Sequence, residues 1–522
     1  MGVEVSGQSG VRRGISRRNL GTLLAGSGLV SVLGGSATAL GAAPDDDGLP
    51  RARPEDEGLA PGVVGAFLDD VAAAGLELDS FMLCRRGKVI AEGWWWPYAP
   101  ARPHMMHSLT KSVTVSAVGM AVAEGRFALT DKVISFFPEH LPAQVSDNLA
   151  AMTVRDLLTM RTGQAIETSG SVWRPLKTSW VAEFYKIPVV YKPGAKFVYT
   201  SAATYMLSAI ITKTTGQRLR DYLEPRFFQP LGITDVHWDM GPENINPGAN
   251  GLSWRTADIV KLCMLYAQQG RWNGRQLLPA DWIAQATRRQ DGNEDYGFQW
   301  WIGPGDAYYA LGLFSQVGLV FPHHDVVLAF TAAIDESRHI MPIVWKHFPS
   351  AFADGPIPRQ DAAWAALRER TAHLRLLPPL IPTTSPLEQR LSGRRFAVAP
   401  NEDGVEAVAF RFADGRCVFT QIDGRGEHTV QAGLRDWIEG STTMTGAKLH
   451  HEYEPDSMPV VAGARWTRPD TLEMTWQFVE SAFRDKVVCR FDGETMTLDR
   501  SVNVNSAALE RPTLRARLVS GA

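Results

Sequence analysis

The sequence has few cysteines and no excess of charge of either sign. Only Cys84, Cys263, Cys417 and Cys489 are present in 522 residues, and none shows a CxxC or Cys/His spacing typical of a metal or redox site. We therefore expect no metal. We interpret the four cysteines as buried thiols, with a Cys417–Cys489 disulfide as the alternative in an exported protein. A net charge of -3 and the lack of like-charged runs argue against a nucleic-acid partner.

The N-terminal segment differs in composition from the rest of the chain. Ser16-Arg17-Arg18-Asn19-Leu20 precedes an apolar, Gly- and Ser-rich stretch over residues 23–40 that contains Ala37-Thr38-Ala39. This pattern is typical of a twin-arginine export signal and predicts a signal peptide over residues 1–39. A retained membrane anchor is the alternative, because a span needs roughly 20 residues. After removal of the signal we expect no stable membrane insertion and a periplasmic, cell-surface or secreted protein.

Residues 50–350 are predicted to form an α+β domain. Hydrophobic periodicity and helix-capping residues indicate helices at 61–74, 108–125, 153–159, 203–215, 254–269 and 279–288. Strands are indicated within 80–92 and at 298–302, 307–313, 317–321 and 326–332. These elements predict an antiparallel sheet interrupted and flanked by helices. A proline-rich linker over residues 351–386, with a short helix at 361–374, follows this domain.

Residues 387–522 are predicted to form a separate antiparallel β domain. Short strands alternate in period two, and turn residues such as Asp414-Gly415 and Asp492-Gly493 join them. This pattern predicts an antiparallel barrel or sandwich, which we describe as lipocalin-like. A role as a wall or partner adhesion module is an alternative, although no residue of this domain indicates a ligand.

Ser108 and Lys111 are the first candidates for chemistry. They form the only Ser-x-x-Lys of the chain, at the start of a helix that is apolar on most faces and hence buried. Side chains three residues apart on a helix can meet. A lysine in a dry pocket has a lowered pKa and can accept the proton of the serine, so this pair predicts an activated nucleophile.

Several further motifs resemble one enzyme family. They are His107-Ser108-Leu109-Thr110-Lys111-Ser112, residues 153–163, Lys192-Pro193-Gly194, residues 197–201 and Pro230-Leu231-Gly232-Ile233. Together they resemble serine β-lactamase-like hydrolases, the group of class C β-lactamases, D-alanyl-D-alanine carboxypeptidases, family VIII esterases and 6-aminohexanoate-dimer hydrolases. The resemblance covers roughly residues 54–348. It implies a β-lactamase/transpeptidase-like fold with an all-helical subdomain, a serine hydrolase activity and no cofactor.

The resemblance also assigns roles to Tyr199 and Ser201. Tyr199 matches the tyrosine of the family's Tyr-x-Asn element, which implies that its phenol carries a proton near Lys111. Ser201 replaces the asparagine and would bind substrate through one hydroxyl instead of an amide. The aminohexanoate-dimer hydrolases resemble this chain in having serine there. Without Ser108 and Lys111, Tyr199 would be interpreted as a core residue.

A third family element is matched loosely by Ala310-Leu311-Gly312-Leu313-Phe314-Ser315-Gln316. The resemblance implies that Gly312 lets substrate approach the strand, and that the backbone N–H groups of Ser108 and Leu313 form the oxyanion hole. The family's Lys/His and Thr, which bind the carboxylate of β-lactams, are missing here. A carboxylesterase or small-amide hydrolase is therefore favoured over a β-lactamase or D-alanyl-D-alanine carboxypeptidase. The alternative is that this strand is only core and that the true element lies elsewhere.

Three aromatic residues lie in a loop-rich insertion between the helical motifs. Trp173, Trp180 and Tyr185 are predicted to shape the substrate pocket, because such insertions carry function on a rigid scaffold. Ordinary packing of large rings is the alternative. His107 is interpreted as a neighbour of the nucleophile and not as a base. The expected partner is a small ester, amide or peptide-like substrate, and a non-catalytic penicillin-binding-like module is the competing hypothesis.

Overall fold

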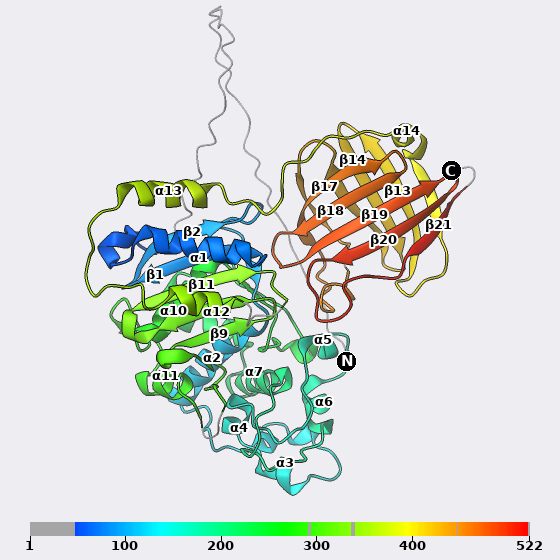
Figure 1. The fold of residues 1–522 in the computed structure, drawn as a ribbon. Helices are drawn as coiled ribbons and strands as arrows, with labels where there is room; N and C mark the ends of the chain where they lie inside the picture. The colour runs from blue at the N-terminus through cyan, green and yellow to red at the C-terminus, as the bar shows by residue number, and fades with distance from the viewer. Residues whose placement is uncertain (1–46, 291–293, 336–339, 445, 520–522) are drawn as a thin grey trace, which may run out of the picture. The chain divides into compact units, whose positions relative to one another are not determined.

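The computed structural model describes residues 47–290, 294–335, 340–444 and 446–519 (Figure 1). The predicted export signal lies outside the described residues. No helix of the described part is long and apolar enough to cross a membrane. All four cysteines are free and buried, which confirms the prediction of buried thiols.

A six-stranded antiparallel sheet forms the centre of the N-terminal domain. Its order is β2 (Lys88–Trp94), β1 (Leu78–Arg85), β11 (Val326–Ala332), β10 (Gln316–Phe321), β9 (Tyr308–Gly312) and β8 (Trp301–Ile302). The predicted strand at 298–302 is therefore reduced to its last two residues, because the chain turns at Gln299, which has a positive φ of 55°.

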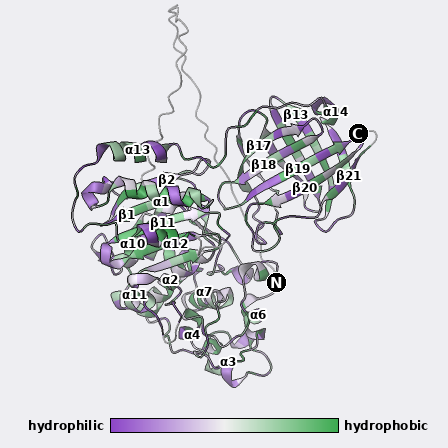
Figure 2. Cartoon of the chain, in the orientation of Figure 1, coloured by the Kyte–Doolittle hydropathy of each residue, from purple (hydrophilic) through white to green (hydrophobic). Residues whose placement is uncertain are grey.

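Helices cover both faces of this sheet. On one face α1 (Pro61–Ala73), α12 (Met341–His347) and α13 (Asp361–Ala372) pack together over Phe81 and Phe330. On the other face α10 (Thr256–Ala267) packs against β1, β10 and β11. Figure 2 shows hydrophobic residues gathered on these central strands. The helix predicted in the linker, α13, thus contributes to the packing of the first domain.

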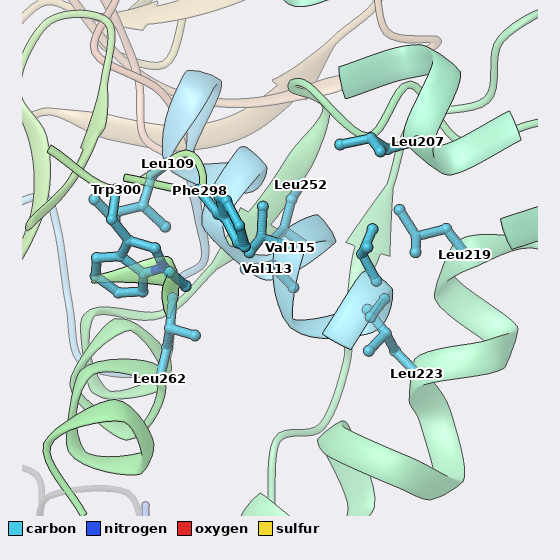
Figure 3. Packing of buried hydrophobic residues seen from close by; sticks show 14 of the residues in the cluster. Leu109, Val113, Val115, Leu207, Leu219, Leu223, Leu252, Leu262, Phe298 and Trp300 are labelled. Atoms are coloured by element: carbon cyan, nitrogen blue, oxygen red, sulfur yellow. The ribbon is translucent and has the colours of Figure 1, made fainter. Parts of the chain in front are cut away.

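The helical subdomain is built around α2 (Thr110–Ala123). Every residue from Thr110 to Ala121 is buried, as the all-round apolar pattern predicts. Helix α7 (Ser201–Thr215) and helix α8 (Leu219–Leu223) pack against α2. Figure 3 shows the residues around it, which include Leu109, Val113, Val115, Leu207, Leu219, Leu223, Leu252, Phe298 and Trp300. The remaining α-helices of the described residues are α3 (Asp147–Ala151), α4 (Val154–Leu158), α5 (Gly170–Trp173), α6 (Trp180–Lys186), α9 (Gln229–Leu231), α11 (Ala280–Ala286) and α14 (Leu387–Leu391), the last of which precedes the barrel strands.

The C-terminal domain is a closed nine-stranded barrel and not a sandwich. Its strands follow the order β15 (Gly426–Gly433), β14 (Arg416–Asp423), β13 (Val405–Ala413), β12 (Arg394–Val398), β21 (Leu514–Leu518), β20 (Thr495–Val502), β19 (Arg484–Asp492), β18 (Thr471–Phe478) and β17 (Met458–Arg468). Gly433 pairs with Gly463 to close the ring, and β16 (Ile438–Thr442) pairs outside it on β17. Buried residues alternate with partly buried ones along β14, and Figure 2 shows hydrophobic and hydrophilic residues interspersed along the strands of the barrel. The predicted α+β fold class, with a separate antiparallel C-terminal β domain, is thereby confirmed.

Candidate active site

Ser108 lies in a tight turn at the start of α2. A 3-10 turn, His107–Leu109, precedes the α-helix, so the helix predicted from residue 108 begins two residues later. His107 has a positive φ of 45°, a conformation that costs free energy for a residue with a Cβ and that clusters at functional sites. The turn places Ser108 at the positive end of the α2 dipole.

Lys111 contacts Ser108 directly. Its Nζ donates to Ser108 Oγ over 2.7 Å and to Ser201 Oγ over 3.3 Å. The lysine side chain is 1% exposed. Burial lowers the pKa of Lys111 from 10.5 to about 7, and the negative charge of Glu167 acts in the opposite direction. Near neutral pH a large share of Lys111 is therefore the free amine that can accept a proton.

Tyr199 faces the same pair of side chains. Lys111 Nζ lies 4.8 Å from the centre of the Tyr199 ring, which stacks on Trp301. Burial raises the pKa of Tyr199 to about 12, while a hydrogen bond with Ser108 acts to lower it. The tyrosine is thus a neutral phenol near neutral pH, bonded to the hydroxyl of Ser108. Ser201, the first residue of α7, completes the group through its bond with Lys111.

A backbone carbonyl that the sequence analysis missed is the third partner of Lys111. Nζ donates to Ala249 O over 3.3 Å. Ala249 lies in a turn-rich loop. The backbone oxygen of the preceding residue, Gly248, accepts a hydrogen bond from Thr114 Oγ1 at 2.7 Å. The loop is therefore fixed to the helix that carries Lys111. The Asn-Pro-Gly-Ala-Asn-Gly run signals a turn, but no sequence signal shows where its carbonyl groups point.

Gln299, a second missed residue, joins the helices of the site. Its backbone oxygen accepts from Ser112 Oγ at 2.8 Å, next to Lys111. Its side chain accepts from Thr204 Oγ1 on α7 at 2.9 Å and donates to Leu157 O at the end of α4 over 3.3 Å. These bonds fix the spacing between the helix of Lys111 and the helix that begins at Ser201.

The end of β9 contacts the turn that holds Ser108. A Cβ on Gly312 would lie 2.2 Å from Met106 O, so only glycine fits there. Gly312 thus lets two backbones approach each other, and its role in the approach of substrate stays a prediction. Leu313, one residue on, is brought beside the turn that holds Ser108.

The turn after Gly312 is held by Gln316, the last residue of the loosely matched motif, whose role the sequence did not indicate. Phe314 and Ser315 have positive φ values of 62° and 72°. The fully buried Gln316 donates through Nε2 to Leu313 O at 3.1 Å and to Ala332 O at 2.8 Å, and its Oε1 accepts from Ala332 N at 3.2 Å. The side-chain amide therefore ties this turn to the end of β11.

The predicted aromatic residues of the insertion are buried. Trp173, Trp180 and Tyr205 form a cluster with ring centres 5.1–5.7 Å apart. The Tyr185 hydroxyl donates to Val133 O at 3.0 Å. These contacts explain the buried positions of the three predicted side chains by packing within the domain. Their role in substrate binding stays a prediction. Among the described residues, no group of three or more His, Cys, Asp or Glu side chains could hold a metal ion.

Comparisons with known proteins identify the family of this chain. The Beta-lactamase family model matches residues 55–342, more than half of the chain. Protein Rv1367c of Mycobacterium tuberculosis (strain ATCC 25618 / H37Rv) is 25% identical over 254 residues, which is 38% of this chain and 63% of the relative. The 6-aminohexanoate-dimer hydrolase of Paenarthrobacter ureafaciens is 22% identical over 250 residues, covering 43% of this chain and 64% of the relative. The chain spans less than two thirds of the length of these curated relatives.

A solved structure also aligns with most of the chain. The octameric penicillin-binding protein homologue from Pyrococcus abyssi shares 14% sequence identity, with a TM-score of 0.45 over 87% of this chain and 99% of that chain. The family assignment rests on the family model. This chain belongs to the Beta-lactamase family of serine hydrolases.

Proposed function

We propose that the protein hydrolyses an ester or a small amide through an acyl-enzyme formed on Ser108. The observation that carries this proposal is the 2.7 Å contact between Ser108 Oγ and a buried lysine amine whose pKa is about 7. Ser108 Oγ would attack the carbonyl carbon while its proton passes to Lys111 Nζ. The backbone N–H groups of Ser108 and Leu313 would bind the oxyanion.

Tyr199 would deliver its phenolic proton to the leaving group and recover a proton from the Lys111 ammonium, which holds the proton taken from Ser108. Because its pKa is raised to about 12, it acts as a phenol that shares a hydrogen bond with Ser108 and not as a standing phenolate. After the leaving group departs, water attacks the acyl carbonyl and releases the acid. In this mechanism Ser108, Lys111, Tyr199 and the backbone N–H of Leu313 carry out these steps.

An ester or small-amide substrate is favoured over a β-lactam or a peptidoglycan stem peptide. The position that the motif comparison assigns to a cationic Lys or His holds Ala310, which is fully buried and has no charge to offer a carboxylate. Glu167 adds a negative charge near Lys111 and Tyr199. Two relatives bear names that fit this choice, 6-aminohexanoate-dimer hydrolase and Esterase EstB of Burkholderia gladioli.

The proposal includes export. Arg17 and Arg18, followed by the apolar stretch at 23–40, support passage through the twin-arginine route and a site of action outside the cytoplasm. Fractionation of cells that express the full chain, with Arg17→Lys/Arg18→Lys as the comparison, tests this part.

The first experiment measures intact-protein mass after exposure to a fluorophosphonate, for wild type and Ser108→Ala. Turnover of p-nitrophenyl butyrate and nitrocefin is followed in parallel. We expect labelling that is absent in Ser108→Ala, ester turnover, and little loss of nitrocefin. A folded wild type that neither labels nor turns over would favour the competing view of a non-catalytic penicillin-binding-like module. Rapid nitrocefin hydrolysis would favour a β-lactamase.

A further inference from the structure

A hairpin of the barrel contacts the residues that flank both oxyanion donors. Residues 479–483 join β18 to β19, and the last of them, Phe483, is fully buried. Its ring centre lies 6.3 Å from that of His107 and 5.7 Å from that of Phe314, in edge-to-face geometry. His107 and Phe314 lie 5.4 Å apart at 88°, so the three rings form a closed cluster.

Two of these rings belong to strained residues beside the site. His107 precedes Ser108 and has φ 45°; Phe314 follows Leu313 and has φ 62°. Such conformations persist only where the surroundings over-determine them. The Nε2 atom of His107 has no hydrogen-bond partner among the described residues, and burial keeps the pKa of His107 well below its usual value. The neutral ring of His107 is therefore held largely by packing against Phe314 and Phe483.

The hairpin itself is anchored to the first domain. Glu480 O accepts from Met105 N at 2.8 Å, and Ser481 O accepts from the Tyr98 hydroxyl at 2.7 Å. Arg484, the first residue of β19, donates two hydrogen bonds to Glu77, at 2.7 and 3.0 Å. His450 stacks on the ring of Phe483, with ring centres 4.6 Å apart. Phe483 therefore has ring contacts from the barrel as well as from the first domain.

We infer that Phe483 is a positioning residue of the hydrolase, through which the barrel holds the oxyanion hole in shape. The inference rests on the proposed function. Loss of this ring lets His107 and Phe314 relax toward ordinary backbone angles, which turns the N–H groups of Ser108 and Leu313 away from the oxyanion. The effect falls on the transition state and not on ground-state binding of substrate, because the two N–H groups bind an oxygen that becomes negatively charged only in the transition state.

The test compares Phe483→Ala and Phe483→Leu with Phe419→Ala. Phe419 is 1% exposed and packs on Phe410 and Trp476 in the same barrel, so it is a matched loss of a core ring. The readouts are kcat and KM for p-nitrophenyl butyrate, the melting temperature, and the Kd of phenylboronic acid, whose tetrahedral adduct with Ser108 places an oxygen in the hole.

For Phe483→Ala we expect kcat to fall about 10- to 100-fold, with KM within about 3-fold of wild type and boronate affinity falling in parallel with kcat. Phe483→Leu should recover part of kcat. Phe419→Ala should lower the melting temperature while kcat stays near the wild-type value. If Phe483→Ala does not fold, the same comparison between Phe483→Leu and Phe419→Ala decides.

Two outcomes overturn the inference in distinguishable ways. An active wild type in which the Phe483 variants keep kcat and boronate affinity at the level of Phe419→Ala refutes the positioning role alone. A wild type that is folded but inactive removes the proposed function and with it this inference.

Discussion

Replacing Lys111 by methionine should inactivate the protein and yet stabilise it, by an amount that depends on pH. Lys111 is protonated in the unfolded chain up to about pH 10.5 but neutral in the folded protein above about pH 7. The unfolded state therefore binds more protons between these values, and wild-type stability rises with pH across this window. Below it, the folded protein must carry a buried ammonium group. Lys111→Met has no such group.

The pKa of Lys111 sets the size of the effect. Between about pH 6 and about pH 10 the free energy of unfolding of wild type should rise by roughly 4 kcal/mol relative to Lys111→Met. All other titrating groups are common to both proteins and cancel in the difference. Urea unfolding followed by tryptophan fluorescence at the two pH values measures it, with the exposed Lys213→Met as a control that should change with pH as wild type does.

Activity gives a second readout of the same group. In the proposed mechanism the neutral amine is the base, so ester turnover by wild type should rise as pH passes about 7 and level off above it. Two results together would refute the assignment of a neutral buried amine to Lys111. The stability difference between wild type and Lys111→Met would be equal at both pH values, and turnover would show no acidic limb near pH 7.

Three further substitutions test other parts of the site. Tyr199→Phe removes the hydroxyl that bonds the nucleophile but keeps the ring, so kcat should fall about 10²- to 10⁴-fold with little change in KM; unchanged kcat would exclude the proton role. Gly312→Ala sets a methyl 2.2 Å from Met106 O, and both the melting temperature and kcat should fall, whereas wild-type values would contradict the close approach. Glu167→Gln removes a charge that raises the pKa of Lys111, so the acidic limb should move to lower pH and not to higher.

Much of the site could be predicted because its residues are linked locally. The three-residue spacing of Ser108 and Lys111 brings two side chains together on any helix, and the structure shows that contact. The motif comparison added Tyr199, which no periodicity would have selected. Likewise the alternation in residues 387–522 predicted antiparallel strands, but it could not distinguish a barrel from a sandwich. That distinction depends on one closing pair, Gly433 with Gly463, which local pattern does not encode.

The residues that sequence reasoning missed act over long distances in the chain or through the backbone. Ala249 contributes a carbonyl group, which every residue has, so its identity carries no signal. Gln299 and Gln316 are polar residues whose roles depend on burial together with their hydrogen-bond partners. Burial is known only once the fold is known. Phe483 lies in the connection between two strands, where a single apolar residue carries no signal of the contacts that it makes.

The distribution of backbone strain explains why these missed residues matter together. His107, Gln299, Phe314 and Ser315 all have positive φ values, and all lie within a few residues of a group assigned to the chemistry or to the helices that hold it. None is glycine, so each conformation costs free energy that neighbouring contacts must offset. Those contacts come from different sources: side-chain amides for Gln299 and for the turn at Phe314, and aromatic packing from the barrel for His107. A site held in this way should lose rate before it loses fold, because relaxing one strained turn moves an N–H group without opening the core around it.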